Sequence, residues 1–370
     1  MKIVFVLSHI PDPRMNKRIN LLKDKYDVVL VYWNRETLNI WEIQHKDIET
    51  YEIRIKAHYT SPVKRILPTF KFAVEVIRYL RKINPDILYT ENIDMLSICS
   101  IYYMFKRNFK IIYEIADLNR LIIDKPDSIV EKLLKKVLTL TERYFSKKVN
   151  LLILTSKKFY DAYYKEFISQ KKMVFMPNIP NLKFFKLYRK KNGGRFTVGF
   201  IGAIRYKDQM KMLIEASEKS GVDILFAGVG LDNEIEQMCL GKQNITYYGK
   251  YNYDSEIAQL YNKVDCVYSV YDADLNNVKV ALPNKLYESI YCELPIIAAK
   301  GTYLAELVEK MGVGVSVNHK DVSELINVLL KISNDKEYYN TLVKGCNRNK
   351  DSIDISKYNE ELLDRIKKLN

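Results

Sequence analysis

Glycine is missing from the first half of the chain, because all 13 glycines lie at or after Gly193. Loops that bind phosphate through backbone N–H groups depend on glycine, so an anion site is expected in the second half. The sequence also lacks a Walker loop, GxxxxGK[ST], and a complete GxGxxG fingerprint. These two absences argue against an ATPase and against an ordinary dinucleotide-dependent dehydrogenase.

Cysteine is sparse, and long apolar runs are missing. The five cysteines form no CxxC pair and no metal-ligand spacing, and an odd, scattered set is typical of reduced thiols in a cytosol. The N-terminal MKIVFVLSHI is too short for a signal peptide and lacks a small-residue cleavage site. The longest apolar stretch, residues 93–105, contains Asp94 and is shorter than a membrane span. We therefore expect a cytoplasmic protein that is soluble or bound to a membrane surface.

Positive charge is concentrated in the first half of the chain. Residues 1–191 contain 37 Lys and Arg against 20 Asp and Glu, a net charge of +17, whereas the remainder has 22 against 25, a net charge of −3. At 370 residues the chain is long enough for two domains, and YRKKNGG at the end of the basic half predicts a linker. The predicted division is an N-terminal domain at 1–187, the linker at 188–194, a C-terminal domain at 195–350, and a helix at 351–370 that can cross back to the N-terminal domain.

Short apolar runs alternate with helical patterns in both halves. The runs KIVFVLS, DVVLVYW, DILYTE, KIIYEIAD, LLILTS and MVFMPN predict strands of the first half. The runs FTVGFIG, DILFAGVG, ITYYGK, DCVYSVY, IIAA and GVSV repeat the scheme in the second half. Strands that alternate with helices form parallel sheets covered on both faces. The predicted fold class is therefore α/β, with two doubly wound Rossmann-like domains that face each other across a cleft.

The stretch PNKLYESIYCELP, residues 283–295, is the most informative part of the second half. Its first proline suits the first turn of a helix, on which Leu286 and Ile290 recur at i, i+4 and face the core. Lys285 and Glu288 are three residues apart on another face of that helix. Two interpretations stay open: an ordinary surface ion pair, or a cation and a carboxylate where such folds bind phosphates and sugars.

Glycine placement points to the same part of the second domain. The run FIGAIRY puts Gly202 at the end of a strand, with Arg205 and Lys207 close behind it. The run AGVG puts Gly228 and Gly230 at the end of the next strand. Glycine at a strand end either forms a tight turn or lets backbone N–H groups reach an anion, and basic side chains nearby neutralise that anion.

The order of these motifs resembles that of a known enzyme family. FIGAIRYKDQMKMLIEA, ILFAGVG, ITYYGKY, DCVYSVY and PNKLYESIYCELPIIAA look like the donor domain of retaining glycosyltransferases of family 4, which have the GT-B fold. LSHIPDPRMNKRINLL, PDILYTEN, IIYEIADL, LLILTSKKF and MVFMPN are similar to the family's bacterial members for capsule, exopolysaccharide and O-antigen synthesis. The resemblance covers nearly the whole chain.

The resemblance implies a metal-independent hexosyltransferase that needs no cofactor. It implies a nucleotide-sugar donor, with UDP as the expected nucleotide, that is bound by the C-terminal domain. The N-terminal domain would bind the acceptor, a cell-surface polysaccharide precursor linked to a polyprenyl diphosphate. The anomeric configuration of the donor sugar would be retained.

The family's donor-binding residues carry over only in part. Glu288 matches the second carboxylate of the family's E-x7-E motif, which binds the ribose hydroxyls, but the first falls on Val280. The tripeptide that ends at Lys285 looks like the Pro-x-Lys variant of some members. Ala203 stands where relatives have an arginine, so Arg205 and Lys207 are our replacements for the diphosphate clamp. The predicted catalytic residues are Arg205, Lys285 and Glu288; the predicted donor-binding residues are Gly202, Arg205, Lys207, Gly228, Gly230, Tyr251, Asn284, Lys285, Leu286 and Glu288.

The acceptor-side residues are expected at strand ends of the N-terminal domain. Ala116 occupies the place where many relatives have a histidine beside the donor sugar. His9 follows the first strand and either caps a turn or contacts substrate; Arg14 either pairs with Asp12 or contacts substrate. The predicted acceptor- or sugar-binding residues are His9, Arg14, Asn92, Glu114 and Asp117. No metal-binding residue is predicted.

A basic, aromatic segment, SPVKRILPTFKFAVEVIRYLRKINPD, suggests where the domain meets a membrane. Its helix either packs its apolar side on the core and leaves a solvated basic face, or binds the anionic cytoplasmic leaflet through Lys64, Arg65, Arg78 and Arg81. We expect peripheral binding at the inner face of the cell membrane, without a spanning helix, because a lipid-linked acceptor would be found there.

Two other functions remain as alternatives. A non-hydrolysing sugar-nucleotide epimerase shares the two-domain architecture but would not need a basic, aromatic acceptor domain. A basic nucleic-acid-binding protein would explain the net charge of +17 in residues 1–191, but no recognised nucleic-acid module is present. We therefore expect no nucleic-acid partner.

Overall fold

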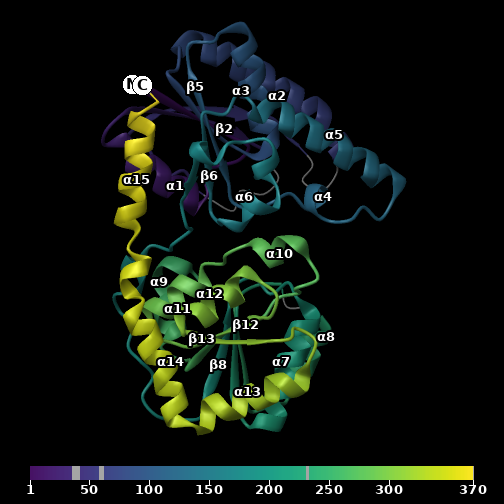
Figure 1. The fold of residues 1–370 in the computed structure, drawn as a ribbon, viewed down its shortest axis with the longest axis vertical. Coiled ribbons are helices and arrows are strands. Elements are labelled where there is room, and N and C mark those ends of the chain that lie inside the picture. The colour runs from purple at the N-terminus through teal and green to yellow at the C-terminus, as the bar shows by residue number, and fades with distance from the viewer. Residues whose placement is uncertain (36–41, 58–61, 231–232, 370) are drawn as a thin grey trace. The chain divides into compact units, whose positions relative to one another are not determined.

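The computed structural model describes residues 1–35, 42–57, 62–230 and 233–369 (Figure 1). The chain divides into two compact units. The first comprises Met1–Pro177 together with Ser356–Asn370, and the second comprises Asn178–Ile355. Each unit is a parallel sheet with helices packed on it, as the alternating sequence pattern predicts.

The first unit is built on a seven-stranded sheet in the order β3-β2-β1-β4-β5-β6-β7, and its neighbouring strands are all parallel. The strands are β1 (Lys2–Leu7), β2 (Asp27–Asn34), β3 (Glu49–Arg54), β4 (Ile87–Glu91), β5 (Lys110–Ile115), β6 (Leu151–Leu154) and β7 (Met173–Phe175). The helices are α1 (Pro13–Lys23), α2 (Pro62–Ile83), α3 (Asn92–Phe105), α4 (Arg120–Ile123), α5 (Ile129–Ser146), α6 (Lys158–Ala162) and, from the end of the chain, α15 (Ile355–Lys367).

The last helix of the chain packs in this first unit. Leu362 and Ile366 of α15 are fully buried in one core cluster with Phe5 of β1 and Ile19 of α1. Helix α1 begins where Asp12 accepts a hydrogen bond from the backbone N–H of the third helical residue, and a proline occupies the first helical position. The helix expected to cross back to the N-terminal domain therefore lies on the same face of its sheet as α1.

Helix α2 begins at Pro62 and not at Thr69, where the aromatic pattern starts. Its side chains Phe72, Val76 and Leu80 are buried, so the core-facing interpretation of that stripe is confirmed. The predicted lipid-binding side chains of Lys64 and Arg65 lie outside the side chains that the structure describes. Among the described helices, none combines the length and the hydropathy that crossing a bilayer requires.

The second unit is built on a six-stranded parallel sheet in the order β10-β9-β8-β11-β12-β13. The strands are β8 (Thr197–Ile201), β9 (Asp223–Ala227), β10 (Ile245–Gly249), β11 (Cys266–Ser269), β12 (Ile296–Ala299) and β13 (Gly314–Val317). The helices are α7 (Lys207–Ser220), α8 (Asn233–Cys239), α9 (Tyr253–Tyr261), α10 (Asn276–Val280), α11 (Lys285–Tyr291), α12 (Tyr303–Met311), α13 (Val322–Asn334) and α14 (Lys336–Arg348).

The division between the units falls at residues 177 and 178, ten residues before the predicted boundary at 187. The physical reason is the short 3₁₀ helix η3 (Leu182–Phe185), which packs on the second unit. The ring centroid of Phe185 lies 5.5 Å from that of Tyr261 and 5.7 Å from that of Tyr291. The predicted linker at 188–194 is thus preceded by a segment that already belongs to the second unit.

Helix α11 is shorter than the stretch PNKLYESIYCELP but has the predicted orientation. Leu286 and Ile290 are buried, and β12 follows as a buried strand over the four residues of IIAA. In the sheet, β8 lies between β9 and β11, so the strand order reverses beside β8. Doubly wound sheets bind ligands at the carboxyl ends of strands at such a reversal. Gly202 directly follows β8 at this place.

Candidate active site

Three glycines let the loops after β8 and β9 approach each other closely. Gly202 and Gly228 have φ angles of +139° and +142°, and a Cβ atom on Gly228 would lie 1.9 Å from the carbonyl oxygen of Gly202. Gly230 has a φ of +97°, and its Cβ would lie 2.6 Å from the carbonyl oxygen of Ile204. The Gly202 N–H donates to the carbonyl of Ala227 at 2.8 Å. Glycine at these positions is therefore required by the fold itself.

The ammonium group of Lys285 lies against the loop of Gly202. A Cβ on Gly202 would be 2.8 Å from Nζ of Lys285, so the missing side chain leaves the room that this cation occupies. The ammonium also lies 4.9 Å from the ring centroid of Phe200 and 5.8 Å from that of Tyr271. Among the residues that the structure describes, no carboxylate pairs with Lys285. Its charge is held by two aromatic faces and stays available to an anion.

The two other predicted phosphate-binding cations differ from each other. Arg205 is exposed and has no acidic partner among the described side chains. Lys207 instead forms an ion pair with Glu234, which Lys211 also contacts. The hydrogen bonds from these two lysines lower the pKa of Glu234 to about 2. Arg205 therefore fits the predicted role in diphosphate binding better than Lys207 does.

Glu288 is buried, and its carboxylate accepts hydrogen bonds from two tyrosines. The hydroxyl of Tyr253 donates to Oε1 at 2.5 Å and that of Tyr261 donates to Oε2 at 2.5 Å. Burial and the negative charge of Glu288 raise the pKa of both tyrosines and of Tyr251, so all three hydroxyls stay protonated. The interpretation of Glu288 as half of a surface ion pair with Lys285 is therefore wrong.

The remaining predicted donor-side residues of this stretch lie at the start of α11, in the core, or near Glu288. The carbonyl of Asn284 accepts hydrogen bonds from the backbone N–H groups of Tyr287 and Glu288, so it starts the helix. Leu286 has 2% of its surface exposed, and its side chain belongs to the core. Tyr251 is half-buried near Glu288. Sequence reasoning missed Tyr253 and Tyr261, because nothing in their spacing shows that they meet Glu288.

In the first unit, a buried network of charges joins the ends of β4 and β5 to α1. Glu114 is fully buried and contacts both Arg14, at 3.0 Å, and Arg18, at 3.2 Å. It also accepts a hydrogen bond from the hydroxyl of Tyr89. Arg14 further bonds Glu91 at 2.7 Å. Glu114 and Arg14 were predicted to contact the acceptor, but they form an ion pair with each other. We therefore propose that they position the site.

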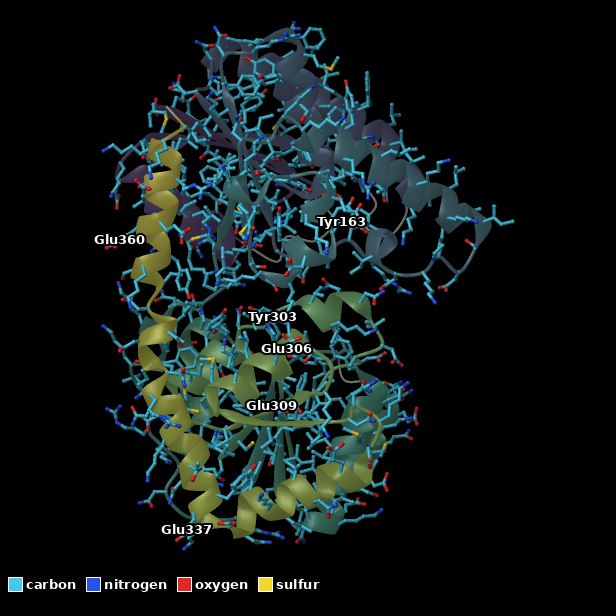
Figure 2. All side chains as sticks on the ribbon, viewed as in Figure 1. Tyr163, Tyr303, Glu306, Glu309, Glu337 and Glu360 are labelled. Carbon is cyan, nitrogen blue, oxygen red and sulfur yellow. The ribbon has the colours of Figure 1, made fainter. Side chains whose placement is uncertain are left out.

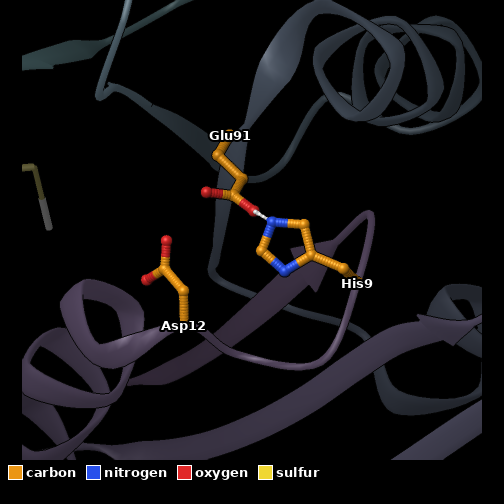
Figure 3. A group of neighbouring side chains, drawn as sticks. All are labelled: His9, Asp12 and Glu91. Atoms are coloured by element: carbon orange, nitrogen blue, oxygen red, sulfur yellow. Dashed lines mark ion pairs between the residues drawn. The ribbon is translucent and has the colours of Figure 1, made fainter. Parts of the chain in front are cut away.

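Glu91 links this network to His9 (Figure 3). Nε2 of His9 lies 3.0 Å from Oε1 of Glu91, and its Nδ1 lies 2.7 Å from the carbonyl oxygen of Ile10. Burial lowers the pKa of His9, but the hydrogen bond and charge of Glu91 raise it more, so the net shift is upward. His9 thereby fixes its own turn and presents a half-exposed imidazole that is easier to protonate than a free one. The expected pairing of Arg14 with Asp12 is present at 3.4 Å, although Glu91 at 2.7 Å is the closer partner.

Two groups of side chains among the described residues could in principle hold a metal ion. Ligand atoms of His9, Asp12 and Glu91 lie within 4.8 Å of one another, and so do those of Asp272, Asp274 and His319. The first group already contacts the guanidinium of Arg14, and Lys320 pairs with Asp274 in the second. Because a cationic side chain already occupies each group, we assign no metal to either.

A cavity of about 480 Å³ lies in the first unit at the carboxyl ends of β1, β4 and β5. His9, Asn92 and Asp117, three of the five predicted acceptor residues, line it. Asn92 has a φ of +59°, and its amide nitrogen donates to the hydroxyl of Ser8 at 3.2 Å. The other lining residues are Ser8, Arg35, Ile93, Asp94, Tyr113, Ile115, Leu118, Asn119, Ile122, Ile123, Leu138, Glu142, Tyr163 and Tyr164.

A buried carboxyl group forms part of the wall of this cavity. Glu142 of α5 accepts hydrogen bonds from Tyr113 at 2.9 Å and from Tyr164 at 2.8 Å. Tyr163, which is labelled in Figure 2, lines the same cavity. Burial raises the pKa of Glu142 more than the tyrosine hydroxyls lower it. No local pattern singles out this residue, because a glutamate within an amphipathic helix is normally expected to face solvent.

The lowered pKa of Glu91 predicts how the free energy of unfolding of the first unit depends on pH. Burial alone would raise its pKa, but the hydrogen bond from His9 and the charge of Arg14 lower it from 4.5 to about 2. The stabilisation is therefore complete above pH 4.5 and is lost as pH falls toward 2, and it amounts to about 3 kcal/mol. We expect the free energy of unfolding of wild type to exceed that of Glu91→Gln by about this amount at pH 6. The difference should shrink as the pH falls from 4.5 toward 2.

Urea unfolding followed by tryptophan fluorescence measures this difference, because Trp33 is buried in the first unit and the sequence of the second unit, residues 178–355, contains no tryptophan. The control is Glu75→Gln, which removes half of an exposed ion pair with Arg78 and should cost little at any pH. A difference between wild type and Glu91→Gln that stays constant from pH 6 to pH 2.5 would contradict the assignment.

Comparisons with known proteins bear on both units. Residues 195–335, most of the second unit, match the family model for group 1 glycosyl transferases. The succinoglycan biosynthesis protein ExoL of Rhizobium meliloti (strain 1021) is 22% identical over 347 residues, which cover 89% of this chain and 84% of ExoL.

Solved structures match the whole chain. Anabaena Alr3699/HepE in complex with UDP is 16% identical, covers 100% of both chains and superposes with a TM-score of 0.73. The sucrose-phosphate synthase of Thermosynechococcus elongatus is 15% identical, with a TM-score of 0.74, over 100% of this chain and 99% of that one. The GT-B fold is confirmed, and so is the resemblance to GT-B glycosyltransferases.

Proposed function

We propose that this GT-B glycosyltransferase moves a sugar from a UDP-sugar to a lipid-linked precursor of a cell-surface polysaccharide and retains the anomeric configuration. Sugar transfer is supported by the family match of residues 195–335. Polysaccharide synthesis is supported by ExoL, a succinoglycan biosynthesis protein. The choice of UDP is supported by the solved complexes of HepE with UDP and with UDP-glucose.

The single observation that carries the proposal is the arrangement around Gly202. The Lys285 ammonium, which pairs with no carboxylate among the described residues, lies against a glycine loop. Arg205 is exposed on the same loop, and Glu288 lies on the same helix as Lys285. When the bond between the sugar C1 and the diphosphate breaks, negative charge builds on the departing oxygen. Fixed cations stabilise that charge, and the carboxylate accepts hydrogen bonds from the ribose diol.

The reaction needs no covalent intermediate on the protein. The bond from C1 to the UDP oxygen breaks, and a bond from C1 to the acceptor oxygen forms on the same face of the sugar. The acceptor's proton passes to the departing phosphate, and UDP is released. In this proposal Lys285 and Arg205 carry the electrostatic stabilisation, and no metal or cofactor takes part.

The acceptor site that we propose is the cavity lined by His9, Asn92 and Asp117. Its mixture of amides, carboxylates and tyrosine rings suits a saccharide, and the half-exposed His9 imidazole can donate a hydrogen bond to a nearby phosphate. A polyprenyl-diphosphate-linked saccharide has both features. We further propose that the protein works in the cytoplasm at the inner face of the membrane, where the basic N-terminal half meets anionic lipid.

Replacing Glu288 by Gln is expected to raise the Kd for UDP about tenfold. Glutamine keeps the volume but replaces a charge-assisted hydrogen bond by a neutral one, which is about half as strong. The Kd for uridine should rise by the same factor, because the ribose is common to both ligands. Isothermal titration calorimetry with UDP and uridine measures both changes.

The control for this variant is Tyr261→Phe, which removes one buried donor to Glu288 and leaves the carboxylate in place. Its melting temperature should fall, whereas its affinity for UDP should change much less than that of Glu288→Gln. Unchanged affinity for UDP in Glu288→Gln, with the fold intact, would rule out ribose binding by this residue.

The proposed function is tested by incubating the protein with a set of nucleotide sugars and detecting products by mass spectrometry. Slow release of UDP and free sugar, with and without EDTA, is expected from a metal-independent transferase that lacks its acceptor. Conversion of a UDP-sugar into an isomer of equal mass, resolved by chromatography, would instead indicate the epimerase. Binding of random RNA without any nucleotide-sugar turnover would indicate the nucleic-acid-binding alternative.

A further inference from the structure

Helix α5 exposes an unusual number of large apolar side chains. Ile129 is 87% exposed, Leu133 63% and Leu140 57%. Only Glu142 and Ser146 of this 18-residue helix are fully buried. The exposed apolar side chains of α5, which we call the α5 stripe, are Ile129, Val130, Leu133, Leu134, Val137, Leu140 and Tyr144.

The stripe is continuous along the helix. Its members recur at spacings of three and four residues, from Val130 through Val137 to Tyr144, so they share one face. On a helical projection, Lys132, Lys136 and Arg143 fall along one border of this face. The stripe itself carries no acidic residue. A broad apolar face bordered by cations is typical of helices that lie in the interface of a membrane.

The opposite face of α5 is fixed to the domain. Leu138 and Glu142 line the cavity proposed for the acceptor, and the ammonium of Lys135 donates to the carbonyl oxygen of Asp124 at 2.8 Å. The same helix therefore forms a wall of that cavity on one side and the apolar stripe on the other. Helix α3 packs beside it (Figure 1). Phe105, the last residue of α3, is exposed.

We propose that the α5 stripe inserts its side chains into the headgroup region of an anionic lipid bilayer. Only the purpose of this surface rests on the proposed function. A lipid-linked acceptor held in that bilayer would reach the cavity along the inner side of the same helix. This assignment moves the main membrane contact from the basic segment around α2, where Phe72, Val76 and Leu80 are buried, to α5.

A lipid surface fits the stripe better than a second copy of the chain. The first unit, residues 1–177 and 356–370, contains 36 Lys and Arg against 23 Asp and Glu, a net charge of +13, so two copies that met through this unit would repel each other, whereas an anionic bilayer attracts it. Lys132 and Lys136 at the border would meet lipid phosphates while the stripe meets acyl chains. The electrostatic attraction of the lysines to lipid phosphates and the burial of the apolar side chains among acyl chains then hold the same helix at the membrane.

Flotation with vesicles of phosphatidylcholine, with and without 30% phosphatidylglycerol, tests the proposal. Wild type should float with anionic vesicles at low salt, and less at 0.5 M NaCl because the Debye length shortens. The triple variant Leu133→Ser, Val137→Ser, Leu140→Ser should lose at least tenfold in partitioning at every salt concentration. Lys132→Gln with Lys136→Gln should lose roughly fivefold per lysine at low salt, and little at high salt.

The matched control is Leu240→Ser in the second unit, where a leucine is 71% exposed outside the proposed surface; its flotation should equal that of wild type. A tryptophan placed by Val137→Trp should shift to the blue and be quenched by brominated lipid, whereas Leu240→Trp should not. Light scattering of the free protein tests whether a second copy covers the stripe. The proposal would be overturned if wild type were a dimer that does not float with the vesicles and the triple variant were a monomer.

These results are separable from the proposed function. UDP binding by each variant, measured in solution without lipid, should match that of wild type, which also shows that the variants fold. If flotation depends on the α5 stripe but the protein turns over no nucleotide sugar, membrane binding by the stripe is supported and the proposed sugar transfer is rejected. Flotation of the triple variant equal to wild type would reject the surface, whatever the reaction.

Discussion

Replacing Lys285 by Ala is expected to lower kcat/KM for sugar transfer or donor hydrolysis about 100- to 1000-fold. The loss corresponds to roughly 3 kcal/mol of transition-state stabilisation, comparable to removing one oxyanion donor. The reason lies in the geometry: Nζ fills the space left by the missing side chain of Gly202 and has no acidic partner among the described residues.

The measurement that identifies the role compares UDP with uridine. Lys285→Ala should weaken the binding of UDP much more than that of uridine, because only UDP carries the diphosphate. Arg205→Ala should show the same selectivity with a smaller loss, since its exposed guanidinium is screened by water. The matched control is Lys211→Ala, which removes an exposed lysine paired with Glu234 on the same unit and should leave turnover unchanged. Equal losses for UDP and uridine would mean that Lys285 acts elsewhere or only on folding.

The fold could be predicted from the sequence because its signals are local. The run KIVFVLS became β1, and IIAA became β12 without a change of boundary. Leu286 and Ile290 are buried as their spacing indicated, since helix periodicity alone decides which face meets the core. The boundary between the units is different, because η3 belongs to the second unit through contacts of Phe185 that no local pattern reveals.

The candidate site was only partly predictable, because its side chains meet through strand register. Gly202 and Lys285 were both found, but their contact joins residues 83 positions apart. Glu91 is one residue in DILYTEN, and it became a central acid only when β4 paired beside β1 and brought it to His9. Glu288 was identified by resemblance, whereas the two tyrosines that hold it come from another helix.

Replacing Glu114 by Ala is expected to destabilise the first unit by about 3–5 kcal/mol. The carboxylate is fully buried and is the partner of Arg18, which is itself 2% exposed, and of Arg14. Removing it leaves Arg18 as a buried charge without its counter-ion, and the desolvation of that charge is no longer compensated. Urea unfolding followed by tryptophan fluorescence measures the loss, since Trp33 is buried in this unit and the sequence of the second unit contains no tryptophan.

Two further variants separate the lost ion pair from a simple truncation. Glu166→Ala makes the same chemical change at an exposed pair with Arg143 and should cost less than 1 kcal/mol. Arg18→Met combined with Glu114→Gln removes the charge of both partners and should recover part of the stability lost in Glu114→Ala, because no unpaired guanidinium remains at position 18. A Glu114→Ala protein no less stable than Glu166→Ala, or a double variant less stable than Glu114→Ala, would show that the buried network does not hold α1 to the ends of β4 and β5.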